Sequence, residues 1–381
     1  MRNGSVYLDN NASTRVREEV LAAMLPWFTE SWGNASSSIH SAGRAARAAI
    51  DNARNEVAAF LRCEPDEVIF TSGASEANAL AIGGARPGGR PPDRVVTADI
   101  EHQSVLSSCF LAQDGGAVMD VVRVSAGGYV SEAALAQLPL TQRSIVSVQW
   151  VNNETGAINP IADIGGVVKG RGALLHVDAA QAPGKADIDL QSIPIDLLTI
   201  SGHKFHGPKG IGALFVRRGT PLEPLIRGGH QERGRRAGTE NVPAIAGLGE
   251  ACRLARLEGS SHRATIGALR DRLERRLRDE VPGTIVIKPA GPRADNTTIC
   301  AWDGLSNRAL LRALDAASIC AASGSACTSE SDGPSHVLRA MNVKPSVARS
   351  AIRISFGRDN TEEETDYVVD TLAEVVEHLR S

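Results

Sequence analysis

Short hydrophobic runs recur between residues 66 and 217 and are separated by amphipathic or glycine-containing segments. Continuous runs of four to eight Val, Ile, Leu and Phe residues are typical of strands buried on both faces of a mostly parallel sheet. Seven such strands are predicted: EVIF (67–70), RVVTA (94–98), VMDVVRV (118–124), SIVSVQWV (144–151), ALLHVD (173–178), DLLTIS (196–201) and GALFVRR (212–218). This alternation predicts an α/β domain with a mostly parallel seven-stranded sheet between helices.

The segment 41–62 is one of the predicted helices that precede and separate the strands. Its apolar residues share one stripe at helical spacing, formed by Ala46, Ile50, Ala53, Val57 and either Phe60 or Leu61. A stripe of this width is typical of a helix that packs one face against a sheet.

The pattern changes after residue 259, where a long amphipathic helix is predicted over 262–281. Its apolar side is formed by Ile266, Leu269, Leu273 and Leu277. The many arginines of this helix alternate with Asp and Glu, which favours a solvent-exposed face over a nucleic-acid surface. Strands are then expected at TIVIK (284–288), TTICAW (297–302) and AIRISFG (351–357), followed by a helix over 361–379 that opens with a Thr cap and several acids.

The chain has 381 residues, which is enough for two domains. We expect a large domain over 16–258 and a small α+β domain formed by 1–15 and 259–381. Lys and Arg number 41 against 44 acidic residues, and the net charge of -3 gives no reason to expect direct nucleic-acid binding. No apolar run is long enough to span a membrane, and the first residues lack a secretory pattern, so we expect a cytoplasmic protein.

The six cysteines have no spacing typical of a metal site or a disulfide framework. Cys63, Cys252 and Cys300 lie in apolar contexts and are expected to pack. Cys327 differs, because it follows AASGSA and precedes TSESDGPS, with no bulky apolar neighbour. Such a stretch is typical either of an ordinary surface loop or of a thiol that moves and reacts.

Polar groups follow five of the predicted strands, at the point where each strand ends. Each has an ordinary explanation alone, such as a helix cap, a structural histidine or an exposed loop lysine. Ligands of open α/β sheets bind outside the carboxyl ends of the strands, so together these groups predict a site. They are Ser75, His102, Asn152 or Asn153, Asp178 with Gln181, and the Ser201, His203 and Lys204 group.

An acid and a lysine at the ends of neighbouring strands favour pyridoxal phosphate as the ligand. Asp178 would keep the ring nitrogen protonated, which makes the ring an electron sink. Lys204 lies at the mouth of a buried strand, where poor solvation favours a neutral, nucleophilic amine that can bind the aldehyde. The backbone amides of residues 73–75 would open a helix, and a helix N-terminus binds phosphate.

The chain resembles the cysteine desulfurases of the class V aminotransferase family, which are fold-type I pyridoxal-phosphate enzymes. The resemblance covers nearly the whole sequence, and order and spacing match as well as content. SGHK and SGSACTS are its most specific segments and indicate the iron–sulfur-type group, whose catalytic loop would span about 321–335. The matching segments are YLDNNAST (7–14), GNASSSIH (33–40), TSGASEANALAI (71–82), EHQSV (101–105), VNNETG (151–156), HVDAAQ (176–181), SGHKFHGPKG (201–210), GGHQERGRRAGTEN (228–241), SGSACTS (323–329) and IRISFG (352–357).

The resemblance implies a role toward the cofactor for each group at the sheet edge. Lys204 is expected to bind the cofactor covalently, Asp178 to pair with the ring nitrogen, and His102 to stack on the ring and assist proton transfer. Asn153 and Gln181 are expected to bond the phenolic oxygen or its surroundings. The phosphate is expected to contact Ala74, Ser75, Ser201 and His203, together with Thr239 of the partner subunit in an obligatory homodimer.

The resemblance also implies the reaction, in which L-cysteine gives L-alanine and an enzyme persulfide on Cys327. Arg353, with Asn153, is expected to bind the substrate carboxylate. His102 and His336 are candidates for activating the thiol. The small residues around Cys327 would let the loop carry sulfur to an acceptor protein, a scaffold or a carrier, for iron–sulfur, tRNA or DNA modification. We therefore expect a mobile segment around 325–333.

One segment departs from the family pattern, and two other functions stay open. GGHQERGRR stands where the family often has three glycines, so His230, Arg235 and Arg236 bear on the site entrance or the acceptor surface. A class V aminotransferase or a selenocysteine lyase would keep the cofactor without the same sulfur transfer to Cys327. A non-catalytic dimeric scaffold is the third interpretation, and the intact set of Lys204 with its partners argues against it.

Overall fold

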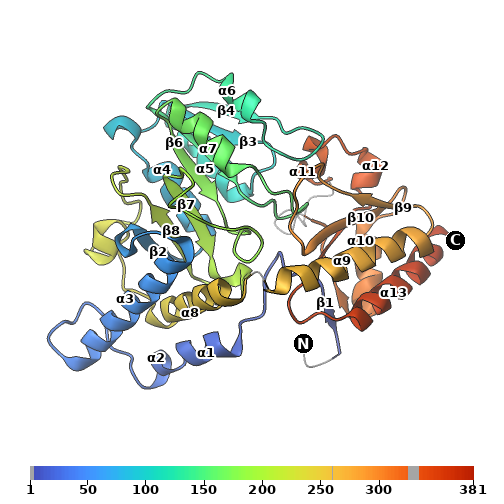
Figure 1. The fold of residues 1–381 in the computed structure, drawn as a ribbon, viewed down its shortest axis with the longest axis horizontal. Coiled ribbons are helices and arrows are strands. Elements are labelled where there is room, and N and C mark those ends of the chain that lie inside the picture. The colour runs from blue at the N-terminus through green and yellow to red at the C-terminus, as the bar shows by residue number, and fades with distance from the viewer. Residues whose placement is uncertain (1–3, 260, 325–333) are drawn as a thin grey trace.

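A seven-stranded sheet forms the centre of the larger lobe of the molecule (Figure 1). The computed structural model describes residues 4–259, 261–324 and 334–381. The sheet order is β2-β8-β7-β6-β5-β3-β4, with β8 antiparallel to both neighbours and the other pairs parallel. The strands are β2 (Val68–Thr71), β3 (Arg94–Ala98), β4 (Val118–Val122), β5 (Ser144–Gln149), β6 (Leu174–Asp178), β7 (Leu197–Ser201) and β8 (Gly212–Val216). The predicted mostly parallel sheet of seven strands is confirmed.

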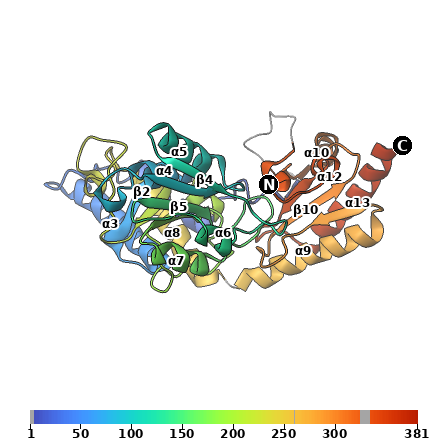
Figure 2. The same cartoon turned by 90° about the horizontal axis from the view of Figure 1, so that it is seen from above.

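Helices cover both faces of this sheet, because successive strand residues point to opposite sides (Figure 2). Ile69 packs on one side, while Val68 and Phe70 pack on the other. The Ile69 side is covered by α4 (Ala74–Gly84) and α5 (Gln103–Asp114). The opposite side is covered by α3 (Ser41–Leu61), α6 (Glu132–Ala136), α7 (Ile161–Gly170) and α8 (Val242–Glu258).

Helix α3 has the buried stripe that its sequence predicts. Its buried apolar residues include Ala46, Ile50, Ala53, Val57 and Leu61. Leu61, rather than Phe60, completes the stripe, while Phe60 is half-buried and stacks on Phe205 with 6.0 Å between the ring centroids. The short helices α1 (Glu18–Met24) and α2 (Pro26–Thr29) precede it along the chain.

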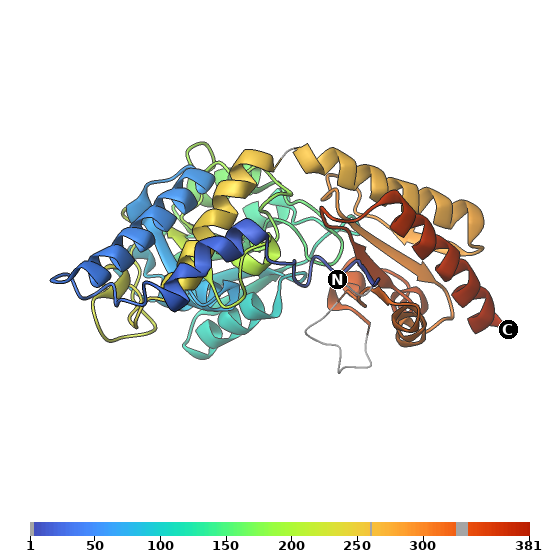
Figure 3. The same ribbon diagram turned by 90° about the horizontal axis from the view of Figure 1, so that it is seen from below.

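The smaller lobe is built on a three-stranded antiparallel sheet of order β12-β10-β9. Helices α9 and α13 lie side by side along it (Figure 3). The strands are β9 (Thr284–Ile287), β10 (Thr297–Trp302) and β12 (Ile352–Ser355). The helices are α9 (Ser261–Glu280), α10 (Asn307–Ala316), α11 (His336–Ala340), α12 (Pro345–Ala348) and α13 (Glu362–Arg380).

The N-terminal segment belongs to the core of the smaller lobe. Strand β1 (Val6–Tyr7) pairs parallel with β11 (Ile319–Cys320), and Val6 and Leu8 pack in the same apolar cluster as Leu269 on α9. The domain limits at residues 15 and 258 stay a prediction. Within the described residues, no helix is long and apolar enough to cross a membrane.

Candidate active site

A cleft of about 540 Å³ lies at the carboxyl-terminal edge of the large sheet. This volume is within the ordinary range for small-molecule sites. The cleft brings together most of the residues that the sequence predicts for the site: Ala74, Ser75, His102, Asn153, Asp178, Gln181, Ser201, His203, Lys204 and Arg353. Thr239 is exposed and is not part of this lining, and Cys327 lies outside the described residues.

The carboxylate of Asp178 is buried at the end of β6 and is held by two donors. The side-chain amide of Asn78, on α4, donates to Oδ2 at 2.8 Å, and the backbone N–H of Ala180 donates to Oδ1 at 2.9 Å. Asn78 also donates to Ser104 Oγ at 2.9 Å, which links α4 to α5. Asp178 therefore braces the turn after its strand and also presents a fixed carboxylate to the cleft.

Lys204 lies in the short helix η3 (Gly202–Lys204), directly after β7. Its Nζ donates to the backbone carbonyls of Asn11 at 2.7 Å and Ala12 at 3.1 Å. Asn11 is buried, and its side chain donates to Thr297 Oγ1 at 2.9 Å and to the carbonyl of Asn153 at 3.1 Å. Asn11 thus connects Lys204, the cleft and the smaller lobe. Asn11 is not among the site residues predicted from the sequence.

Glycines shape the turn that leads into α4. Gly73 is the N-cap residue and has a φ of 152°, a conformation that favours glycine. A Cβ on Gly212 of β8 would lie 2.6 Å from the carbonyl oxygen of Ile200 and 2.9 Å from the Gly73 backbone. Only glycine therefore fits there, and the first amides of α4 are left at the cleft, where a helix N-terminus can bind an anion.

Two groups flank this anion-binding turn. Burial and the nearby Lys204 and Lys209 lower the pKa of His203 to about 4, so its imidazole is neutral at ordinary pH. Glu76, in the first turn of α4, accepts from the backbone N–H of Ser72 at 2.7 Å and pairs with Arg236 at 2.8 Å. Arg236 is thus held beside the turn within its own chain.

His102 has a structural role and also lines the cleft. It is the N-cap of α5, and its Nδ1 accepts from the backbone N–H of Ser104 at 3.1 Å. Because Nδ1 accepts, the proton of the neutral ring belongs on Nε2. Burial lowers the pKa of His102, although Asp178 opposes this shift.

His336 lines the cleft from α11. Its Nε2 donates to the backbone carbonyl of Glu101 at 3.0 Å. Burial raises the pKa of the Glu101 carboxyl well above its usual range, with Asp178 and Asp99 acting in the same direction. A second histidine is therefore held at the cleft, close to where the Cys327 segment ends.

Arg353, on β12, is 2% exposed and is fixed by contacts that the sequence did not predict. Its Nη2 pairs with Asp9 at 2.5 Å, and its Nη1 donates to the carbonyls of Asn153 at 3.0 Å and Gly324 at 2.9 Å. Its Nε is buried and has no partner among the described residues. The guanidinium as a whole lines the cleft, so it is a candidate to bind the carboxylate of a substrate.

Both described ends of the Cys327 segment meet Glu154, which also lines the cleft. Ser335 Oγ donates to Glu154 Oε2 at 2.5 Å. Gly324 has a φ of 92°, and a Cβ there would lie 2.8 Å from the same oxygen. Burial raises the pKa of Glu154. The segment that carries Cys327 therefore leaves and rejoins the described structure at the cleft.

The described cysteines are unsuited to nucleophilic chemistry, since only the thiolate attacks. Burial raises the thiol pKa of Cys63, Cys109 and Cys300 to about 12 in each case, and it also raises those of Cys252 and Cys320. None of these five lines the cleft. Among the described residues, no group of three or more His, Cys, Asp or Glu side chains could hold a metal ion.

Comparison with known proteins agrees with this arrangement. The model of the family "Aminotransferase class-V" matches residues 6–368. A cysteine desulfurase of Gluconacetobacter diazotrophicus is 45% identical over 378 residues, which are 99% of this chain and 94% of the relative. The chain belongs to the cysteine desulfurases of the aminotransferase class-V family.

Solved structures of this family have the same fold. A NifS-like protein superposes with a TM-score of 0.91 at 35% identity, covering 98% of this chain and 100% of that one. SspA, in a complex with cysteine, superposes with a TM-score of 0.80 at 34% identity, covering 94% of this chain and 100% of that one.

Pyridoxal phosphate is the cofactor of the class V aminotransferase family, and the cleft of this desulfurase fits it. A lysine amine, a buried carboxylate and an anion-binding helix N-terminus meet in one cavity. The Arg353 guanidinium lines the same cavity and adds a cation suited to the substrate carboxylate. These are the groups that a pyridoxal-phosphate enzyme of amino acids requires.

Proposed function

We propose that this chain moves the sulfur of L-cysteine onto Cys327 as a persulfide and releases L-alanine. The observation that supports this most directly is the position of Arg353. Its guanidinium lines the cofactor cleft and also donates to Gly324, the last described residue before the Cys327 segment. A carboxylate-binding group, a cofactor lysine and the start of this segment therefore share one cavity.

When bound, pyridoxal phosphate supplies an electron sink for the charge that develops on the substrate α-carbon. We assign Asp178 to hold the ring nitrogen protonated and Lys204 Nζ to move the α-proton. Arg353 and Asn153 hold the substrate carboxylate, while Ala74, Ser75, Ser201 and His203 hold the phosphate. The neutral His102, with its proton on Nε2, is placed to stack on the ring and exchange a proton at that atom.

The sulfur step balances without an external oxidant or reductant. The thiolate of Cys327 bonds to the substrate sulfur, and the bond between that sulfur and the β-carbon breaks. The carbon keeps the electron pair and takes a proton, which gives alanine. Cys327 is left with one additional sulfur, and a second thiol can then remove it.

We also propose that the active unit is a homodimer. Several large apolar side chains of the larger lobe are exposed, among them Phe28, Trp32, Ile39, Leu225 and Ile226. Arg47 bonds both the carbonyl of Ala35 and the carboxylate of Glu240, so the 32–39 segment lies beside Thr239. A partner that covers this surface would bury Thr239 near its own phosphate turn. We propose further that the persulfide sulfur passes to a sulfur-acceptor protein and that the enzyme is cytoplasmic.

The test is to supply L-cysteine and a thiol reductant to the purified, cofactor-loaded protein and to measure alanine and sulfide. Equal amounts of both products are expected. Cys327→Ser should abolish both, whereas Cys320→Ser, a matched control outside the cleft lining, should keep them. Full alanine release by Cys327→Ser would favour a selenocysteine lyase, and consumption of cysteine without alanine or sulfide would favour an aminotransferase. Protein without a cofactor absorbance band would favour a scaffold.

A further inference from the structure

Lys185 is a half-buried lysine that the proposed mechanism does not use. Its Nζ donates to Asn11 Oδ1 at 2.8 Å and also to Gln181 Oε1. No carboxylate lies within ion-pair distance of Lys185 among the described residues. An amine whose two bonded partners are neutral amides that line the cofactor cleft is unusual, because buried lysines are normally paired with an acid.

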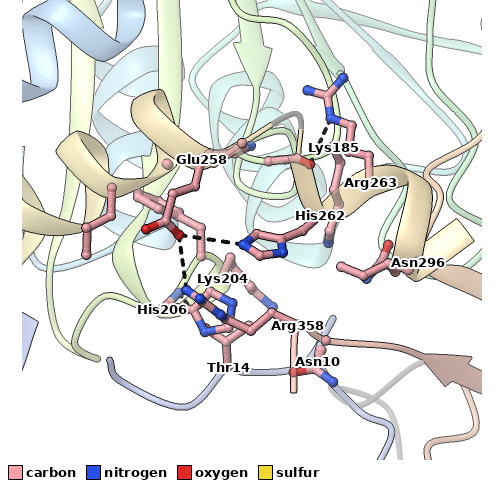
Figure 4. A pocket seen from close by; sticks show the side chains of 18 of the residues that line it. Asn10, Thr14, Lys185, Lys204, His206, Glu258, His262, Arg263, Asn296 and Arg358 are labelled. Atoms are coloured by element: carbon pink, nitrogen blue, oxygen red, sulfur yellow. Dashed lines mark hydrogen bonds and ion pairs between the residues drawn. The ribbon is translucent and has the colours of Figure 1, made fainter. Parts of the chain in front are cut away.

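The surroundings of Lys185 are positively charged. Burial, together with Lys204 and Arg353, lowers the pKa of Lys185 well below its usual range. On its other side Lys185 lines a second cavity of about 120 Å³ (Figure 4). The other charged or titratable groups around that cavity are Arg17, His206, Glu258, His262, Arg263, Asp295 and Arg358.

Glu258, one of the two acids of that second cavity, is paired with residues other than Lys185. Glu258 pairs with Arg17 at 2.5 Å, with Arg358 at 3.3 Å and with His262 at 3.7 Å. Figure 4 shows Glu258 facing His262, with a dashed line that marks their ion pair. The contacts of Lys185 therefore lead toward the cofactor cleft, through Asn11 and Gln181.

The hydrogen bond from Lys185 fixes the orientation of the Gln181 side-chain amide. An ammonium group can only donate, so the oxygen of Gln181 must face it. The Gln181 nitrogen then faces the opposite way, where one of its hydrogens bonds the carbonyl of Asn11 at 2.7 Å. Gln181 lines the cleft, and within the described residues the second hydrogen of that nitrogen has no hydrogen-bond acceptor. Gln181 thus presents a donor, rather than an acceptor, to the cofactor.

We propose that Lys185 is a positioning residue that acts through Gln181, holding an N–H donor toward the phenolic oxygen of pyridoxal phosphate. This rests on the assignment of Gln181 to that oxygen under the proposed function. Donation to the phenolic oxygen stabilises the deprotonated chromophore. Lys185 thereby lowers the pH at which the cofactor's visible absorbance changes.

The experiment is a spectroscopic pH titration of the cofactor-loaded protein without substrate. Lys185→Met removes the donor and the charge, and the midpoint of the absorbance change should rise by about one pH unit. Lys185→Arg keeps both properties and should return the midpoint toward the wild-type value. Lys344→Met is the matched control, since Lys344 is exposed and pairs with Asp303, and its midpoint should equal that of the wild type.

A Lys185→Met midpoint that is unchanged, or that falls, overturns the inference. If Lys185→Met does not fold, Lys185→Gln is titrated instead, because it keeps a donor without the charge and should give a smaller rise in the same direction. The outcome is separate from that of the proposed function. Wild-type protein that titrates normally but releases no alanine from cysteine refutes the proposed function and leaves the midpoint comparison intact.

Discussion

The buried ion pair between Arg54 and Glu232 gives a quantitative test of how the HQERGRR segment is held. The two side chains are 5% and 3% exposed. They form two parallel bonds of 2.8 and 2.7 Å, and Glu232 also accepts from the backbone N–H of Phe70 at 3.0 Å. Arg54 donates to the carbonyl of Val68 at 2.7 Å. One ion pair thus connects α3, β2 and the segment that leads to Thr239.

Arg54→Met would leave the Glu232 carboxylate buried without its cation. Removing one partner of a buried pair costs about 3–5 kcal/mol, which is a large part of the 5–15 kcal/mol typical of a whole domain. The matched control is Arg256→Met. Arg256 pairs with Glu56, which lies on α3 like Arg54. These two side chains are 42% and 36% exposed, so the loss in unfolding free energy should stay below about 1 kcal/mol.

The assay is urea unfolding of cofactor-loaded protein, followed by circular dichroism at one protein concentration. The midpoint of Arg54→Met should fall well below those of the wild type and Arg256→Met. Because the segment leads to Thr239, the cofactor absorbance of Arg54→Met should also be lost at a lower urea concentration. Equal midpoints for the two variants would refute the argument that this pair anchors the segment.

The remaining predictions concern the cleft. Asp178→Asn should keep the cofactor through Lys204 but lose alanine release by at least about 100-fold, because an amide does not hold the ring nitrogen protonated; near-normal turnover would contradict this. Since burial lowers the pKa of His102, its neutral form should persist below the ordinary value near 6.5 and be lost only as the pH falls through the lowered pKa. A pH profile of kcat/KM should therefore have an acid limb below 6.5 that His102→Gln removes, and a limb at or above 6.5 argues against this. Thr239→Val should weaken cofactor retention by about tenfold without dissociating the dimer, as measured by dialysis and light scattering, and unchanged retention would count against a phosphate contact from the partner.

The sheet could be predicted because most of its strands are buried on both faces and are therefore continuously apolar, whereas the edge strand β4 has exposed positions at Val118 and Val121. The polar groups at the strand ends come together for the same reason, since parallel strands end at one edge. Strands β1 and β11 have two residues each and no pattern of their own, so their pairing was not predictable.

The contacts that hold the site residues in place could not be predicted from the sequence. Arg54 and Glu232 are 178 positions apart, and Gln181 meets Asn11 across 170 positions. No local spacing indicates such pairs, because they arise only when the chain folds. Lys185 follows Gln181 by four positions, yet its importance depends on the charges that the fold places around it.

The most direct test of the central claim is to locate the sulfur after a single turnover. Cofactor-loaded protein is mixed with one equivalent of L-cysteine, without reductant, and its peptides are examined by mass spectrometry. The account predicts that the Cys327 peptide gains one sulfur atom in an amount equal to the alanine released, and that Cys327→Ser forms neither product. Alanine release while the Cys327 peptide stays unmodified would contradict the claim.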